Sequence, residues 1–373
     1  MFVLIAAKSV VIAGGTLLAL QFMRGRSASD RSWIAHLGLV AIAALPLGSV
    51  LFPPLEVTTS YASLLAYAAP AGSGATWTAL AADWLLMAYA VPALVLIALT
   101  LLALFRLVLL TARARAVTDD HWLEALTTTR QRSGITKSAI LLVSHEIASP
   151  VSWGALRPKI LLNTDVLGAR GDADAILAHE LAHVARADWL KLMLVRVSVA
   201  MFWFNPFVWQ LARVAHQLRE EAADDAVLGA DIEDTTYASL LVSSARHQPS
   251  GLLLGAHDVA PARNSLAQRV RRVLDRGLNR SASGTRWTAV MGVGAAALTA
   301  PLMILQLTDA ALASSAFAPF APDADAEVIM FELRAPPGEP SPLPPLSKEA
   351  SGPDAADGEG AAGIVPAERE NAL

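Results

Sequence analysis

Residues 178–211 read AHELAHVARADWLKLMLVRVSVAMFWFNPFVWQL, a pair of histidines followed by a long apolar run. His179 and His183 stand in the pattern H-E-x-x-H among good helix formers, and residues four apart lie on the same face of an α-helix. We expect this helix to begin near Asp172, with Asp172 or Asp174 as its N-cap. The fold of the apolar run beyond it depends on the rest of the chain.

The composition of the chain indicates a membrane protein. Of its 373 residues, 54% are hydrophobic and 17% are charged, and the mean hydropathy is positive. Four apolar runs, each of about 20 residues or more, are long enough to span a bilayer. They lie at residues 1–23, 33–52, 80–110 and 287–307. The chain has no cysteine, which excludes disulfides, thiolate metal ligands and a cysteine nucleophile.

The arginines beside these runs predict their orientation. The loop between the first two spans, the end of the third and the segment before the fourth all carry arginines, whereas residues 53–79 contain no lysine or arginine. Because basic loops face the cytoplasm, we expect residues 111–286 on that side of a bacterial inner membrane. The N-terminus and the tail after residue 308 are then outside. Lys8 lies near the outer end of its span, where we expect its ammonium to reach the headgroups.

The segment between the third and fourth spans predicts a small α+β domain. It contains a helix at 119–132, strand-like stretches at 138–144 and 157–163, and then the helix of the histidine pair. The fold class that we expect is therefore a mainly α membrane protein with about four transmembrane helices and a cytoplasmic α+β domain. The tail at 308–373 is rich in alanine, proline and acidic residues and is expected to be mostly disordered.

The histidine pair has the spacing of a zinc site. His179 and His183, one helical turn apart, can both direct a ring nitrogen at a single ion, so we predict that they are its first two ligands. Glu180 is placed to take a proton from a metal-bound water as the general base. A catalytic zinc also needs a third protein ligand and an open position for water.

We expect the third ligand in the acidic stretch REEAADDAVL at 219–228. Glu220 and Asp224 lie one turn apart, which suits a carboxylate ligand and a second carboxylate that orients a ligand histidine. Glu221 and Asp225 have the same spacing, shifted by one residue. The spacing alone leaves both registers open.

A shared site also restricts the fold of the apolar run at 189–211. If this run crossed the membrane once, His179 and Glu220 would lie on opposite sides and would not share an ion. Two basic residues and the break at Asn205–Pro206 also argue against a plain lipid-facing helix. We therefore expect a re-entrant or interfacial hairpin, or burial against the other spans. The zinc site would then lie at the cytoplasmic membrane surface or slightly within it.

Together these motifs resemble the BlaR/MecR-type integral-membrane zinc metallopeptidases, a family of antirepressor and signal-transducer peptidases. The resemblance rests on HELAH, on WFNPFVWQ at 203–210 and on the acidic stretch, and it covers about residues 1–308. It implies a gluzincin-like domain in which Glu220 is the zinc ligand, which selects that register. It also implies that SPVSWGALRPKILL at 149–162 forms a strand beside the substrate cleft.

The resemblance implies a zinc endopeptidase that cleaves a cytoplasmic or membrane-proximal protein, with a winged-helix transcriptional repressor as the expected substrate. Tyr237, His216 and His247 are downstream polar candidates for a donor to the oxyanion, and we retain Tyr237. Only about 65 residues follow the last span, and they contain no S-x-x-K motif. We therefore expect no penicillin-binding sensor domain and no beta-lactam sensing by acylation.

Two other functions compete with this one: a non-proteolytic membrane receptor or scaffold, and a general quality-control protease. The intact zinc motif favours hydrolysis, because a scaffold has no physical need for the general base Glu180. The partners that we expect are the protein substrate, the lipid bilayer and a second copy of the chain in a homodimer. The net charge of -4 does not indicate nucleic-acid binding, and none is expected.

Overall fold

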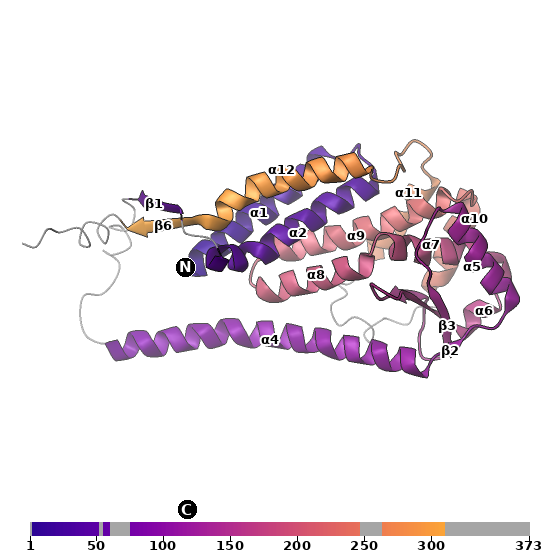
Figure 1. Cartoon of the computed structure of the whole chain (residues 1–373), viewed down its shortest axis with the longest axis horizontal. Helices are drawn as coiled ribbons and strands as arrows, with labels where there is room; N and C mark the ends of the chain where they lie inside the picture. Colours follow the sequence, from indigo (N-terminus) through magenta and orange to yellow (C-terminus); the bar gives the residue numbers. More distant parts are fainter. Residues whose placement is uncertain (1, 52–54, 60–74, 247–262, 310–373) are drawn as a thin grey trace, which may run out of the picture. The chain divides into compact units, whose positions relative to one another are not determined.

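Among the residues that this computed structural model describes (2–51, 55–59, 75–246 and 263–309), four helices are long and apolar enough to cross a membrane. They are α1 (Phe2–Phe22), α2 (Ala28–Leu51), α4 (Ala75–Arg113) and α12 (Thr285–Ile304) (Figure 1). The four predicted membrane helices are thus confirmed in length and composition. The tail predicted to be disordered lies, from residue 310 onward, outside the described residues.

The apolar run after the histidine pair forms a helical hairpin. Its two arms are α8 (Asp188–Met201) and α9 (Pro206–Leu228), which pack against each other. Asn205 ends the turn because its side chain accepts a hydrogen bond from the Phe207 N–H at 2.9 Å, and Pro206 suits the first helical position. The chain therefore folds back at Asn205–Pro206, and α9 brings Glu220 towards the helix of the histidine pair.

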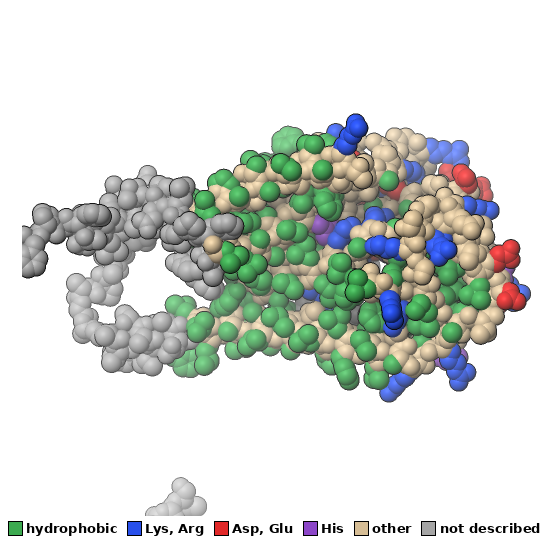
Figure 2. Space-filling model, viewed as in Figure 1, with side chains coloured by type: hydrophobic (Ala, Val, Ile, Leu, Met, Phe, Trp, Pro, Cys, Tyr) green, Lys and Arg blue, Asp and Glu red, His purple; other side chains and the backbone are tan. Residues whose placement is uncertain are grey.

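This hairpin packs against the membrane spans. The central helix is α2, which contacts α1, α12 and both arms of the hairpin, and the shared core contains Leu39, Ile42 and Val208. At Gly38 the approach of α1 is so close that an added Cβ would collide with Thr16. Figure 2 shows hydrophobic side chains over the spans and the charged side chains gathered towards the opposite end of the described part.

Lys8 contacts the end of α12, and its predicted reach to the headgroups stays a prediction. Its side chain is buried, and Nζ donates hydrogen bonds to the carbonyl oxygens of Leu305 at 2.5 Å and Met303 at 3.4 Å. The last carbonyls of a helix lack partners within the helix, and the end of α12 lies within reach of α1. The ammonium therefore satisfies these carbonyls.

The domain beyond the spans contains a four-stranded sheet with the strand order β2-β3-β5-β4. The strands are β2 (Arg115–Ala116), β3 (Ile140–Ser144), β4 (Val151–Trp153) and β5 (Lys159–Asn163). β3 and β5 are parallel, and the other two pairs are antiparallel. The predicted strands at 138–144 and 157–163 are confirmed. β4 is a short edge strand, and it contacts the helix of the histidine pair.

Helices complete the domain. They are α5 (Asp120–Arg132), α6 (Thr164–Leu167), a 3-10 turn (Arg170–Asp172), α7 (Ala173–Ala185), α10 (Asp234–Arg246) and α11 (Arg263–Leu274). A further parallel strand pair joins β1 (Leu55–Thr59) to β6 (Leu305–Asp309). The helix predicted at 119–132 is confirmed as α5. α7 begins as expected, but the Asp172 side chain makes no capping hydrogen bond, and Asp174 lies in the first turn of the helix.

Candidate metal centre

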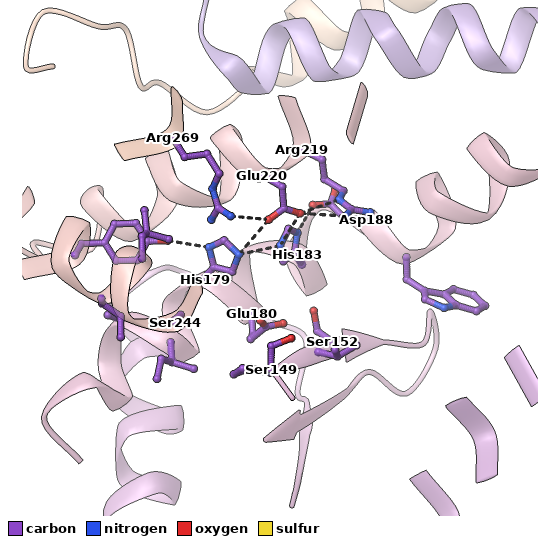
Figure 3. Close-up of a pocket in the computed structure, with 18 of the residues that line it drawn as sticks. Ser149, Ser152, His179, Glu180, His183, Asp188, Arg219, Glu220, Ser244 and Arg269 are labelled. Carbon is purple, nitrogen blue, oxygen red and sulfur yellow. Dashed lines mark hydrogen bonds and ion pairs between the residues drawn. The ribbon is translucent and has the colours of Figure 1, made fainter. Parts of the chain in front are cut away.

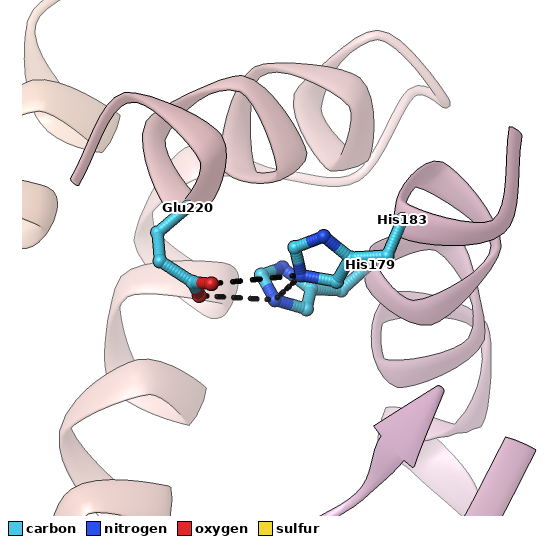
Figure 4. Close-up of side chains that lie close together, drawn as sticks. All are labelled: His179, His183 and Glu220. Carbon is cyan, nitrogen blue, oxygen red and sulfur yellow. Dashed lines mark hydrogen bonds and ion pairs between the residues drawn. The ribbon is translucent and has the colours of Figure 1, made fainter. Parts of the chain in front are cut away.

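Three side chains from α7 and α9 face a common point (Figure 4). The Nε2 atoms of His179 and His183 are 3.2 Å apart, and the carboxylate oxygens of Glu220 lie 3.7 Å from the first and 3.8 Å from the second. One ligand atom from each residue lies within 4.8 Å of the other two. Ligands held about 2 Å from a tetrahedral ion are about 3.3 Å apart, so this arrangement suits zinc after a small contraction.

The structure distinguishes the two registers of the acidic stretch. Glu221 and Asp225 are buried on another face of α9, where Glu221 accepts a hydrogen bond from the Gln268 side chain at 2.8 Å and Asp225 pairs with Arg272 at 2.7 Å. Neither carboxylate belongs to the cluster that faces the two histidines. Glu220 is therefore the member of this stretch that is placed to bind a metal.

A polar network contacts the Nδ1 atom of His179. Asp224 Oδ1 lies 3.4 Å from His179 Nδ1, and the Tyr237 hydroxyl lies 3.0 Å from the same nitrogen. The hydroxyl donates to Asp224 Oδ1 at 2.7 Å, and Arg269 donates from two nitrogens to the two Asp224 oxygens, each at 2.7 Å. Asp224 thus lies where a carboxylate orients the imidazole. Because the Tyr237 hydroxyl contacts both His179 and Asp224, it is placed to position the imidazole, and its role as an oxyanion donor stays a prediction.

His183 has its own supporting carboxylate, Asp188, which the sequence reasoning missed. Its Oδ2 lies 2.7 Å from His183 Nδ1, and the side chain is also paired with Arg186 at 2.7 Å and Lys191 at 2.9 Å. Burial alone would raise the pKa of Asp188, but His183 and the two cations outweigh it and hold the pKa far below its usual range. The carboxylate is therefore charged and orients the imidazole.

The turn at Ala187 delivers this carboxylate. Ala187 has a left-handed backbone with φ of 52°, an unusual conformation for a residue with a Cβ. It lies between the end of α7 and the start of α8, so Asp188 in the first turn of α8 faces back towards His183. The only local signal in the sequence was an acidic residue five positions after His183.

The Glu220 carboxylate is held by two arginines. Arg219 donates to Oε1 at 3.0 Å, and Arg269 Nη1 lies 3.4 Å from Oε2. Burial favours the neutral acid, but the ion pair with His179 and the nearby positive charges lower the pKa of Glu220 well below its usual value. Glu220 is therefore ionised, as a metal ligand must be.

The same carboxylates act on His179. Burial disfavours the charged imidazole, but the nearby carboxylates of Asp224 and Glu220 outweigh it and raise the pKa of His179 to about 9. An imidazole that binds a metal must be neutral, so an arriving ion displaces this proton. The donor set of two imidazoles and one ionised carboxylate fits Zn²⁺.

Glu180 lies in the same cleft as the three ligand candidates (Figure 3). The cleft has a volume of about 320 Å³, and Glu180 is only 6% exposed. Figure 3 shows its carboxylate on the side of Ser149 and Ser152. Ser152 lies in the edge strand β4, and Ser149 precedes this strand. Trp189 and Leu192 of α8 also line the cleft, which places the start of the membrane-packed hairpin at its wall.

Of the other two oxyanion candidates, the structure describes only His216. His216 lies beside Arg219, whose Nη2 is 3.0 Å from His216 Nδ1. His247 lies outside the described residues.

The arginines that contact Glu220 were not predicted from the sequence. Arg219 is adjacent to the ligand in sequence, but Arg269 comes from α11, and no local pattern connects that helix to the site.

Comparison with known proteins relates the chain to membrane peptidases. The family model described as BlaR1 peptidase M56 matches residues 56–273. The Regulatory protein BlaR1 of Bacillus licheniformis is 32% identical over 113 residues, which are 30% of this chain. The matched part spans 19% of the length of that relative. The family match includes the histidine pair, the hairpin and the acidic stretch.

Proposed function

Because this chain belongs to the BlaR1 peptidase M56 family, we propose that it is an integral-membrane zinc-dependent endopeptidase. The observation that carries the proposal is the convergence of His179, His183 and Glu220 on one point, with Glu180 in the same cleft. A hydrolytic metal site needs three protein ligands, an open position and a general base, and these residues supply each part.

Different residues of the chain have different roles in the proposed hydrolysis. When bound by His179, His183 and Glu220, zinc supplies a Lewis acid that polarises the scissile carbonyl and lowers the pKa of water. Glu180 takes a proton from the attacking water and passes it to the leaving amine. Asp188 and the Asp224–Tyr237 pair hold the imidazoles with Nε2 towards the ion. The edge strand β4 offers backbone groups to an extended peptide.

We further propose that the substrate is a regulatory protein, with a winged-helix transcriptional repressor as the first candidate. The relative from Bacillus licheniformis is named as a regulatory protein, which supports a role in signal transduction. The arginine-bearing loops support an orientation in which residues 111–286 face the cytoplasm of a bacterial inner membrane, where such a repressor is found.

A Glu180→Gln variant separates the peptidase from a non-proteolytic receptor or scaffold. Zinc content is measured by mass spectrometry on the full chain purified in detergent, and new protein N-termini are profiled in cells that express each variant. We expect Glu180→Gln to keep one zinc per chain and lose the new N-termini, because the ligands remain and the base is gone. Glu124→Gln, an exposed glutamate on α5, is the matched control.

Each outcome has a distinct meaning. Zinc retained together with unchanged cleavage in Glu180→Gln would refute general-base hydrolysis at this site. Wild-type protein without zinc, or zinc retained in His179→Ala, would refute the metal centre. Many unrelated cleaved membrane proteins, in place of one regulator, would favour general quality control over signal transduction.

A further inference from the structure

The turn between β4 and β5 presents an uncovered leucine. Leu156 is 97% exposed, and its neighbour Arg157 is also exposed. The turn is specified by Gly154, whose φ is 96° and at which a Cβ would lie 3.1 Å from the Arg157 carbonyl oxygen. A single exposed leucine is common on soluble proteins, so its position relative to the membrane decides what it means.

The turn is attached to the end of a membrane span. Trp153, the last residue of β4, donates from Nε1 to Thr111 Oγ1 of α4 at 3.0 Å. Its ring centroid lies 6.4 Å from that of Trp189 at the start of α8, the helix that packs against the spans. The β4–β5 turn therefore lies beside two helices that enter the membrane-packed part of the protein.

The length of α4 sets the depth of this attachment. Its apolar span, Trp84–Arg113, has 30 residues, or about 45 Å of helix, whereas the hydrocarbon core of a bilayer is about 30 Å thick. The arginine-bearing end must therefore leave the hydrocarbon. Arg106 is the first arginine of this end, and Thr111 lies five residues, or about 7.5 Å of helix, beyond it. Trp153 is thus held at about the level of the headgroups.

The surroundings of Trp153 have the composition of a membrane interface. Val108 and Leu109 of α4 and Leu190 of α8 are exposed apolar residues close in sequence to the two contacts of Trp153. Lys159 Nζ lies 5.2 Å above the Trp153 ring. Tryptophan, leucine and basic residues together are typical of segments that lie at the headgroup level, where basic groups meet anionic phosphates.

We propose that the β4–β5 turn, residues 154–157, inserts Leu156 into the interface of the bilayer that α4 spans. Insertion removes the leucine side chain from water and places Arg157 and Lys159 beside lipid phosphates. The consequence concerns the cleft, because Ser152 of β4 lines it. Lipid contact at the turn holds the edge strand at the membrane surface, which favours peptide segments that lie next to the bilayer.

Single cysteines test this proposal directly, because the chain has none of its own. Leu156→Cys in the full chain is spin-labelled and reconstituted in nanodiscs of phosphatidylcholine and phosphatidylglycerol. Collision rates of the label with oxygen, which enriches in lipid, and with a water-soluble nickel chelate report its depth. Leu101→Cys, on the exposed surface of α4, is the lipid reference. Leu123→Cys, an exposed leucine of α5 at the end of the domain away from the spans, is the matched aqueous control (Figure 1).

We expect the label at 156 to have a higher ratio of oxygen to nickel collisions than the label at 123, approaching the ratio at 101. A ratio at 156 equal to that at 123 would overturn the proposal. A fully exposed position tolerates the label, and an unchanged melting temperature of each labelled protein confirms that it is folded. The test requires only the membrane location of the chain, so it is independent of the proposed peptidase activity.

Discussion

Replacing Asp188 by alanine is expected to weaken zinc binding about 10- to 100-fold. The hydrogen bond of 2.7 Å between His183 Nδ1 and Asp188 Oδ2 selects the tautomer that leaves the Nε2 lone pair for the metal. Without this acceptor, the ring rotates and exchanges its proton between the two nitrogens. Arg186 and Lys191 also lose the buried carboxylate that neutralises them, and their charges then repel the ion.

Both effects act in the same direction, which allows a magnitude to be worked out. A tenfold change in affinity corresponds to about 1.4 kcal/mol, so the expected loss is about 1.4–2.8 kcal/mol. A hydrogen bond to a charged group contributes about 1.5–3 kcal/mol, in agreement with this range. Asp188→Asn keeps an oxygen that accepts from His183 and loses only the charge, so its loss is expected to be smaller.

The assay is a competition titration of zinc against a chromophoric chelator, with the full chain in detergent. Asp234→Ala is the control, because Asp234 pairs at 2.8 Å with Arg276, which is 83% exposed, and neither residue lines the cleft. Thermal unfolding of the metal-free variants separates a loss of folding from a loss of affinity. If folded Asp188→Ala bound zinc as tightly as Asp234→Ala, the positioning role of Asp188 would be wrong.

Three further predictions follow from the site. Glu180→Gln is expected to lower the rate of peptide hydrolysis on the order of 10²- to 10⁴-fold with unchanged zinc content, as measured by single-turnover cleavage. Arg269→Gln leaves Asp224 with an uncompensated buried charge and is expected to lower the free energy of unfolding by about 3–5 kcal/mol, whereas exposed Arg276→Gln should cost less than about 1 kcal/mol in the same urea titration. Removing zinc with a chelator is expected to lower the melting temperature of wild-type protein and leave that of His179→Ala unchanged, because ligand that binds the folded state stabilises it.

The local part of this protein was predictable from sequence. Apolar runs identify membrane helices because a span must satisfy its backbone internally and present side chains that lipid tolerates. The histidine pair was equally predictable, because His179 and His183 lie on one helix whose geometry fixes their spacing. Even the return at Asn205–Pro206 followed from one requirement, that both halves of the site reach a single ion.

Contacts between distant segments were harder to predict. The spacing of the acidic stretch did not distinguish Glu220 from Glu221, since both lie on α9 and only the packing of α9 against α7 decides which one faces the histidines. The resemblance to a known family selected Glu220, and the structure brings that residue to the site. The partners of Lys8 were missed for the same reason, because the carbonyls that it binds lie almost 300 residues away in the sequence.

Local sequence patterns were enough to predict the membrane helices, the small α+β domain and the pair of histidines with their neighbouring glutamate. Each depends on periodicity or spacing within one segment. The groups that orient those histidines are known only from the packing of distant segments. Asp188 reaches His183 through a left-handed turn at Ala187, and Arg269 reaches Asp224 from a separate helix. Such contacts depend on how helices pack in three dimensions, and the spacing of residues along the chain does not encode them.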